Sequence, residues 1–249
     1  MTTQQRSEPI PSRHRAQRGA APGTWRLARV GVLATAAVGV LAATAGAAQA
    51  VAFSNGFSTD TSGIAIADND AFALSTAHDP MSFEDSFTVH QYGQVEAASV
   101  RNESTAESVA CAPDSPCRAV SLSFQIITMA GTDIHLNAVN LSNATNVHCA
   151  GCQTLAGAYQ FVVDTPSAFK LSPAAEAQLA AIHRELNALS NSDLSTSDVQ
   201  SRADALAVQV AAILKTAATP AQTPIAHAQN SAAPRLAPAV TVYRDFQQH

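Results

Sequence analysis

One short pattern occurs twice in the middle of this chain, and it restricts the fold more than any other feature of the sequence. The shared residues are Gly93, Asn102, Ser104, Ala106, Val109 and Cys111 in the first copy and Gly131, Asn140, Ser142, Ala144, Val147 and Cys149 in the second, at a constant offset of 38. Each copy then reaches a second cysteine, Cys117 or Cys152, at an offset of 35, and runs into a similar apolar stretch. Because equivalent sequences should occupy equivalent places, the chain contains a duplicated structural unit.

Apolar and polar residues alternate inside the duplicated unit, as they do in β-strands. From Val120 to Ile126 every second residue is apolar, and the residues between them are serines and a glutamine. One apolar face and one polar face favour an antiparallel sheet with its polar side in water. The repeat units cover about residues 86–128 and 124–165, so the sequence predicts a small antiparallel sheet built from them.

Two helices are expected after the duplicated unit, over about residues 173–190 and 198–217. Ser172 and the proline after it form a typical helix start, and Ser197 to Gln200 has the form of a capping box. Apolar residues recur at spacings of three and four, which predicts an antiparallel helical hairpin on or beside the sheet. The predicted fold class is therefore α+β, in one domain at 83–217.

The segments that flank this domain are expected to lack regular structure. Residues 51–82 are rich in Ser, Thr, Asp and Gly, which predicts a flexible lead-in. Residues 218–249 are rich in Pro, Ala, Gln and Ser, which predicts a disordered tail. Within that tail only Val240 to Tyr243 alternates as a strand would.

The first 50 residues have the form of a signal peptide. Six arginines face one glutamate, an uncharged stretch runs from Val30 to Ala47, and Ala48 to Ala50 supplies the small residues of a cleavage site. Cleavage after Ala50 is the expected outcome. An uncleaved N-terminal membrane anchor is the alternative, because the uncharged stretch continues to Thr59 and is long enough to cross a bilayer.

Either outcome places the rest of the chain outside the cytoplasm, secreted or anchored in the membrane through its N-terminal segment. Residues 51–249 hold 8 of the 14 basic and 18 of the 19 acidic side chains, so their net charge is −10. Nucleic acids and anionic membrane surfaces are bound by clustered Lys and Arg, and neither partner is expected for so acidic a chain.

The four cysteines permit three interpretations. In an oxidising compartment disulfides are favoured, with local pairing of Cys111 to Cys117 and Cys149 to Cys152, and pairing between the copies as the alternative. The second is a zinc site made by the four thiolates, with His148 as a spare ligand, although the first pair is spaced more widely than is usual. The third is thiol redox chemistry at Cys149 and Cys152, which normally requires such a pair to begin a helix.

Other catalytic chemistry has little support. The sequence contains no His-Glu-x-x-His, no Gly-x-Ser-x-Gly and no phosphate-binding glycine loop. The remaining histidines, His183 among them, are expected at the surface. The duplicated Asn102 and Asn140 are expected to be turn and register residues, with Asn140 also fitting the end of a returning strand. We therefore expect a non-catalytic binding or envelope-associated structural protein without a cofactor, whose partner is an envelope protein or is unknown. Metal binding or thiol redox centred on Cys149 and Cys152 is the alternative.

The second copy also carries a resemblance. From Asn140 to Val163, with the weaker copy before it and two predicted helices after it, the chain resembles a group of uncharacterised exported actinobacterial proteins over about residues 86–219. Some of these carry the label peptide zinc metalloprotease, but no catalytic residue can be mapped onto a chain that lacks the zinc-binding helix motif. The resemblance implies an extracytoplasmic module. The longer loop from Cys111 to Cys117 departs from that group, in which both copies have two residues between their cysteines.

Overall fold

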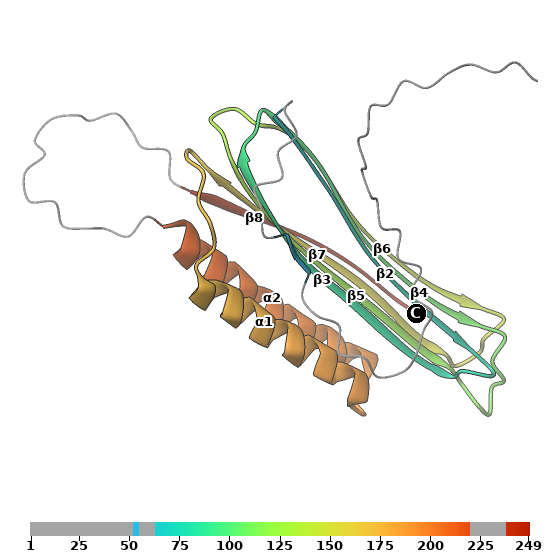
Figure 1. The fold of residues 1–249 in the computed structure, drawn as a ribbon. Helices are drawn as coiled ribbons and strands as arrows, with labels where there is room; N and C mark the ends of the chain where they lie inside the picture. The colour runs from blue at the N-terminus through green and yellow to red at the C-terminus, as the bar shows by residue number, and fades with distance from the viewer. Residues whose placement is uncertain (1–51, 55–62, 220–237) are drawn as a thin grey trace, which may run out of the picture. The chain divides into compact units, whose positions relative to one another are not determined.

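The described part of the chain winds through three stacked coils, and each coil gives one strand to each of two sheets (Figure 1). This computed structural model describes residues 52–54, 63–219 and 238–249. The coils are β2 (Ile64–Thr76) with β3 (Met81–Gln94), β4 (Ala97–Val109) with β5 (Arg118–Ala130), and β6 (His135–Val147) with β7 (Gln153–Thr165).

The two sheets are almost entirely parallel. Sheet A has the order β1-β3-β5-β7-β8 and sheet B the order β2-β4-β6. β1 (Ala52–Ser54) pairs with β3 in parallel, and β8 (Ala239–Gln248) pairs with β7 in the antiparallel direction. The prediction of a small antiparallel sheet is therefore wrong, because the repeated units stack on one another as the coils of a β-solenoid.

The polar face of β5 lies inside the molecule rather than in water, which explains the error. Ser121, Ser123 and Gln125 are fully buried between the two sheets. The Ser121 hydroxyl donates to the carbonyl of Ala71 at 2.9 Å, and the Gln125 amide donates to the carbonyl of Arg101 at 2.9 Å. Both faces of β5 are covered, as is usual in parallel sheets.

The offsets of the sequence repeat match the register in which neighbouring strands of these sheets pair. Asn102 pairs with Asn140 between β4 and β6, and Arg118 pairs with Gln153 between β5 and β7. These pairings correspond to the offsets of 38 and 35 in the sequence. The repeat therefore fixes the stacking of the second and third coils directly.

The first coil is not a flexible lead-in. Within residues 51–82, the segment 64–76 forms β2, in which buried and exposed residues alternate along the strand. Its buried side chains are mostly alanines, such as Ala65, Ala67 and Ala73. Alanine buries little apolar surface, so the alternation of buried and exposed residues in β2 is hard to recognise from the sequence.

The tail is also ordered where the structure describes it. The sequence predicts disorder over 218–249, but β8 completes sheet A and continues the ladder beyond β7. The Phe246 ring packs edge-on against Tyr159, with ring centroids 5.2 Å apart. The Arg244 guanidinium lies over Phe246 and donates to Asp204 at 2.6 Å. These partners are distant in sequence, so the composition of the tail did not reveal them.

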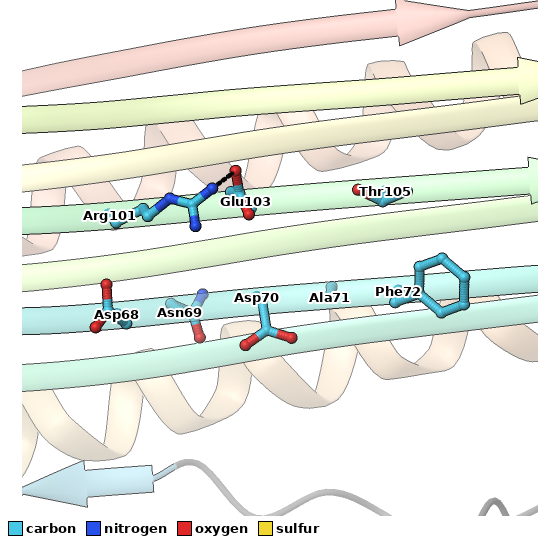
Figure 2. Close-up of a pocket in the computed structure, with 8 residues that line it drawn as sticks. All are labelled: Asp68, Asn69, Asp70, Ala71, Phe72, Arg101, Glu103 and Thr105. Atoms are coloured by element: carbon cyan, nitrogen blue, oxygen red, sulfur yellow. Dashed lines mark hydrogen bonds and ion pairs between the residues drawn. The ribbon is translucent and has the colours of Figure 1, made fainter. Parts of the chain in front are cut away.

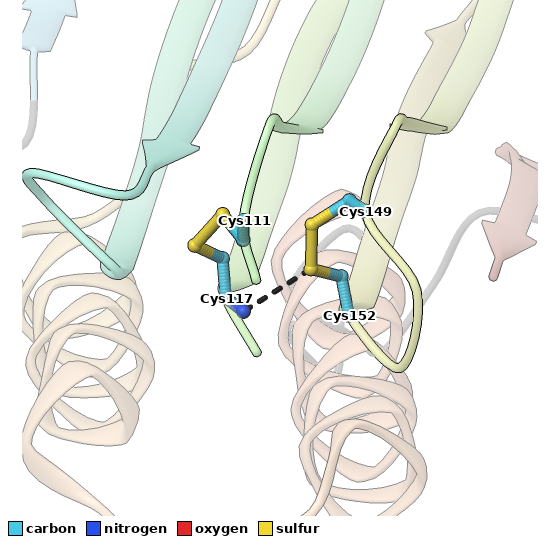
Figure 3. Close-up of side chains that lie close together, drawn as sticks. All are labelled: Cys111, Cys117, Cys149 and Cys152. Atoms are coloured by element: carbon cyan, nitrogen blue, oxygen red, sulfur yellow. Dashed lines mark hydrogen bonds between the residues drawn. A yellow bond between two sulfur atoms is a disulfide. The ribbon is translucent and has the colours of Figure 1, made fainter. Parts of the chain in front are cut away.

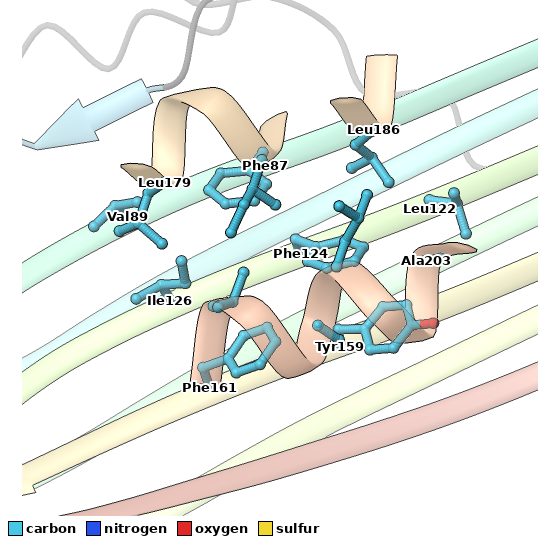
Figure 4. Packing of buried hydrophobic residues seen from close by; sticks show 14 of the residues in the cluster. Phe87, Val89, Leu122, Phe124, Ile126, Tyr159, Phe161, Leu179, Leu186 and Ala203 are labelled. Atoms are coloured by element: carbon cyan, nitrogen blue, oxygen red, sulfur yellow. The ribbon is translucent and has the colours of Figure 1, made fainter. Parts of the chain in front are cut away.

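Two helices cover the outer face of sheet A (Figure 4). α1 (Pro173–Ala188) is capped by the Ser172 hydroxyl, and a 3₁₀ turn, η1 (Leu189–Asn191), leads toward α2 (Thr196–Ala218). The second cap is Ser195, two residues before the predicted capping box. The two helices share one apolar core with β3, β5 and β7; its members include Phe87, Leu122, Phe124, Tyr159, Phe161, Leu179, Leu186 and Ala203.

The predicted signal or anchor at residues 1–50 lies outside the described residues. None of the described helices is long and apolar enough to span a membrane. The described residues belong to one compact unit, Gly46–His249.

Candidate functional site

The four cysteines gather at the end of the solenoid where strands of sheet B cross to sheet A (Figure 3). Cys111 and Cys117 stand at disulfide distance with Cα atoms 5.9 Å apart, and Cys149 and Cys152 do so with Cα atoms 5.6 Å apart. All four cysteines of the chain are paired in this way. This is the local connectivity that the sequence favoured.

The two cysteine pairs also face each other. All four side chains are buried, and their Sγ atoms lie within 4.8 Å of one another. The backbone N–H of Cys117 donates to the Sγ of Cys152 at 3.1 Å (Figure 3). His148, the spare ligand of the zinc hypothesis, is exposed and does not belong to this group.

The loops that carry the two pairs follow the same backbone path. Ala110 and His148 precede the first cysteine of each pair, and both adopt the left-handed conformation, with φ of 55° and 49°. Such values are uncommon for residues other than glycine, so their repetition reflects equivalent positions in stacked coils. Cys152 leads into β7 rather than into a helix, so the arrangement differs from that of thioredoxin-like redox sites.

A ladder of asparagines crosses sheet B on its inner face. The Asn69 amide donates to the Asn102 side-chain oxygen at 2.9 Å, and the Asn102 amide donates to Asn140 at 2.8 Å. The Asn140 amide donates in turn to the carbonyl of Ala158 at 2.9 Å. The prediction that Asn102 and Asn140 lie in turns is therefore wrong, because both lie in mid-strand, whereas their expected role in strand register agrees with the pairing of three coils.

His183 is not at the surface, contrary to the prediction. Only 2% of it is exposed, and its Nε2 lies 3.0 Å from the Asp85 carboxylate and 3.0 Å from the Asn187 amide. The Phe87 ring stacks on the imidazole with centroids 5.2 Å apart. The pair joins α1 to β3, and its burial leaves no access for a substrate.

The outer face of sheet B, which consists of the side chains of β2, β4 and β6 that point away from sheet A, is exposed. The described helices pack on sheet A instead. Ile66 is 63% exposed, Phe72 51% and Leu141 49%, all on this face. Apolar side chains therefore reach solvent on at least two strands of this face.

A hollow of about 300 Å³ lies on this face along β2 and β4 (Figure 2). Asp68, Asp70 and Phe72 line it from β2, and Arg101 and Glu103, which form an ion pair, line it from β4. The hollow is therefore lined by charged side chains at one end and by Phe72 and Thr105 at the other.

The two edges of sheet B differ in how they are closed. At the β6 edge, Asp245 of β8 accepts from the backbone N–H of Ser142 at 2.7 Å, and Gln247 accepts from that of Ala144 at 3.3 Å. At the other edge, β2 pairs along its whole length with β4 and, within the described ranges, with no further strand. The side chains of β8 thus cap one end of the solenoid only.

Comparison with known proteins gave no match: no family model fits the chain, and no curated protein or solved structure is significantly similar to it. The resemblance to exported actinobacterial proteins stays a prediction. Within the described residues, the features that bear on function are the cysteine cluster, the outer face of sheet B and the edge of β2 that carries no further strand.

Proposed function

We propose that this protein is a non-catalytic binding module that works outside the cytoplasm and accepts an extended segment of another protein at the free edge of β2. The paired cysteines support an oxidising compartment, because disulfides persist outside the cytoplasm. The observation that carries the proposal is the difference between the two edges of sheet B, of which only the β6 edge is capped by β8.

A long open edge is a template for another strand, and proteins normally protect it. β2 is 13 residues long, and its backbone groups alternate between the two sides of the strand. The carbonyl of Ala71 accepts from the Ser121 hydroxyl at 2.9 Å, on the side of β4, whose Ser104 also contacts Ser121. The backbone groups of the even-numbered residues therefore face the free edge, where the Tyr92 hydroxyl reaches the Ile66 carbonyl. From Asp68 to Leu74 no further strand lies beside this edge among the described residues, so these groups are the ones proposed to pair with a partner.

The side chains beside this edge indicate the chemistry of the partner. Ile66 and Phe72 are exposed on the outer face, and Asp68 and Asp70 lie between them. Directly opposed residues of neighbouring strands interact, and opposite charges stabilise such pairs. The partner segment would place basic side chains beside the two aspartates and apolar side chains beside Ile66 and Phe72, in the manner of peptide recognition by strand addition.

A labelled synthetic peptide, Val-Ala-Lys-Ser-Lys-Ala-Val, tests this proposal by fluorescence anisotropy. Asp70→Pro removes the N–H that faces the free edge and leaves the β4 side of β2 intact, so binding should be lost. The double change Asp68→Asn and Asp70→Asn should weaken binding roughly two- to thirtyfold, since exposed ion pairs contribute modestly. Glu107→Gln, the matched charge change on the central strand β4, should leave binding unchanged.

Equal binding by Asp70→Pro and the unaltered protein would exclude strand addition. A peptide with both lysines replaced by glutamate should not bind, and added salt should weaken the lysine peptide. Sedimentation of the free protein provides a further check. A dimer that Asp70→Pro dissociates would identify a second copy of the chain as the occupant and would contradict the proposed partner.

A further inference from the structure

The cysteine cluster has a second capacity that is independent of the proposed binding function. Each disulfide is local to one coil, yet the stacking of coils brings both into one buried cluster. We infer that the four cysteines form a latent site for one soft divalent metal ion such as Zn²⁺, which is closed by the disulfides and opened by their reduction. The ligands would be Cys111, Cys117, Cys149 and Cys152.

Hydrogen bonds on both sides of the cluster would keep the cysteines in place after reduction. The Ala110 N–H donates to the carbonyl of Val147 at 2.9 Å, one residue before Cys111 and two residues before Cys149. The Gln153 N–H, directly after Cys152, donates to the carbonyl of Cys117 at 2.9 Å. Both bonds join one coil to the next, so the loops remain stacked without either bridge.

The distances suit a tetrahedral thiolate site. A zinc–sulfur bond of about 2.3 Å places the four sulfurs of such a site about 3.8 Å apart. The four Sγ atoms lie within 4.8 Å of one another, so after reduction side-chain rotations that separate the two sulfurs of each pair would bring all four to that spacing. A purely thiolate set of ligands selects zinc-like ions over Mg²⁺ and Ca²⁺, which prefer oxygen.

One backbone group already favours the thiolate form. The Cys117 N–H points at the Sγ of Cys152 from 3.1 Å, and such donors stabilise the negative charge of a metal-bound sulfur. The cluster is buried, which would keep competing water away from a bound ion.

The chemistry balances with an external dithiol as reductant. Each protein disulfide gains two electrons and two protons and becomes two thiols, while the dithiol becomes its own disulfide. The four thiols then release up to four protons as the divalent ion binds, which leaves a site with a net charge of −2. An oxidant that reforms the two disulfides expels the ion, so the two forms exclude each other.

Cobalt titration of the full chain tests the inference. The protein is reduced with a phosphine, which becomes its oxide with oxygen from water, and is desalted without air. One equivalent of Co²⁺ should then bind with the visible and charge-transfer absorption of a tetrahedral tetrathiolate, and Zn²⁺ should displace it. The oxidised protein should bind none. Circular dichroism should show the same strand content before and after reduction.

Two variants separate this site from weaker alternatives. His148→Ala should bind cobalt as the unaltered protein does, because His148 is outside the cluster. The double change Cys149→Ser and Cys152→Ser should weaken binding roughly tenfold or more, because it removes two of four ligands. Two equivalents bound, unchanged binding by the double variant, no binding, or a reduced protein that unfolds and stays unfolded with metal would each overturn the inference.

Discussion

The side-chain amide of Asn102 donates to the side-chain oxygen of Asn140 at 2.8 Å, although the two residues are 38 positions apart in the chain. The same amide group of Asn102 also contacts the carbonyl of Tyr159, and its oxygen accepts from Asn69 and Ser123. This one side chain therefore joins all three coils of sheet B to sheet A.

Replacement of Asn102 by Ala should lower the free energy of unfolding by about 3 kcal/mol, because several buried partners lose their hydrogen bonds at once. Denaturant unfolding measures the effect. The control is Asn143→Ala, which removes an exposed asparagine of β6 and should change stability by less than about 0.5 kcal/mol. Equal costs for the two changes would show that the ladder does not hold the coils together.

The stacking of the second and third coils could be read from the sequence because their offsets are nearly constant. The first coil also carries this pattern, since Asn69, Ala71, Ala73 and Ser75 pair with Asn102, Ser104, Ala106 and Ser108. Its offset is 33 because both connections of the first coil, from β2 to β3 and from β3 to β4, are shorter than those of the second coil. The sequence therefore contains three copies of the pattern at unequal offsets, and three stacked copies correspond to a solenoid.

The sequence did not show which face of each strand is buried and which is exposed. Ser121 and Gln125 look like solvent-facing residues, whereas Ile66 and Phe72 look like core residues, and the structure reverses both. Polar residues are buried here because the opposite sheet satisfies them, which depends on contacts between distant strands. The cysteine pairs were predictable from spacing, but the contact between the two pairs was not.

The close approach of Gly157 and Phe246 should control the docking of β8. A Cβ atom on Gly157 would lie 2.6 Å from the Phe246 ring and 3.1 Å from Leu122. Gly157→Ala should therefore cost about 1–3 kcal/mol of stability by overpacking. In the double variant with Phe246→Ala, denaturant unfolding should show a total cost about 1 kcal/mol below the sum of the single costs. If the two single costs simply add, the contact between Gly157 and Phe246 does not determine how closely β8 packs on β7.

The phenol of Tyr92 should make stability fall at alkaline pH. Burial, and secondarily the Asp68 carboxylate, raise the pKa of Tyr92 from 10.0 to about 12. The folded state thus favours the neutral phenol, whose contribution is complete below pH 10 and is lost as the pH rises toward about 12.

Comparison with Tyr92→Phe isolates this contribution. The variant should lose about 1 kcal/mol at neutral pH, because the hydrogen bond to the Ile66 carbonyl is removed. The difference in unfolding free energy between the two proteins should shrink as the pH rises above 10. Tyr159, whose pKa is raised by burial and by Asp204, titrates in both proteins and cancels. A constant difference up to pH 11 would contradict the raised pKa.

The two disulfides should stabilise the protein modestly and independently. They close short loops, with sequence separations of 6 for Cys111 and Cys117 and 3 for Cys149 and Cys152. The entropy of closing such loops corresponds to about 2 kcal/mol for each bridge. Replacing either pair by alanines should lower the free energy of unfolding by that amount, with an unchanged denaturant slope, because the strand ladders and the helical core remain. Loss of cooperative unfolding in either variant would instead show that the stacked loops depend on the disulfides. The backbone hydrogen bonds between coils next to these loops would then be too weak to hold the coils in register.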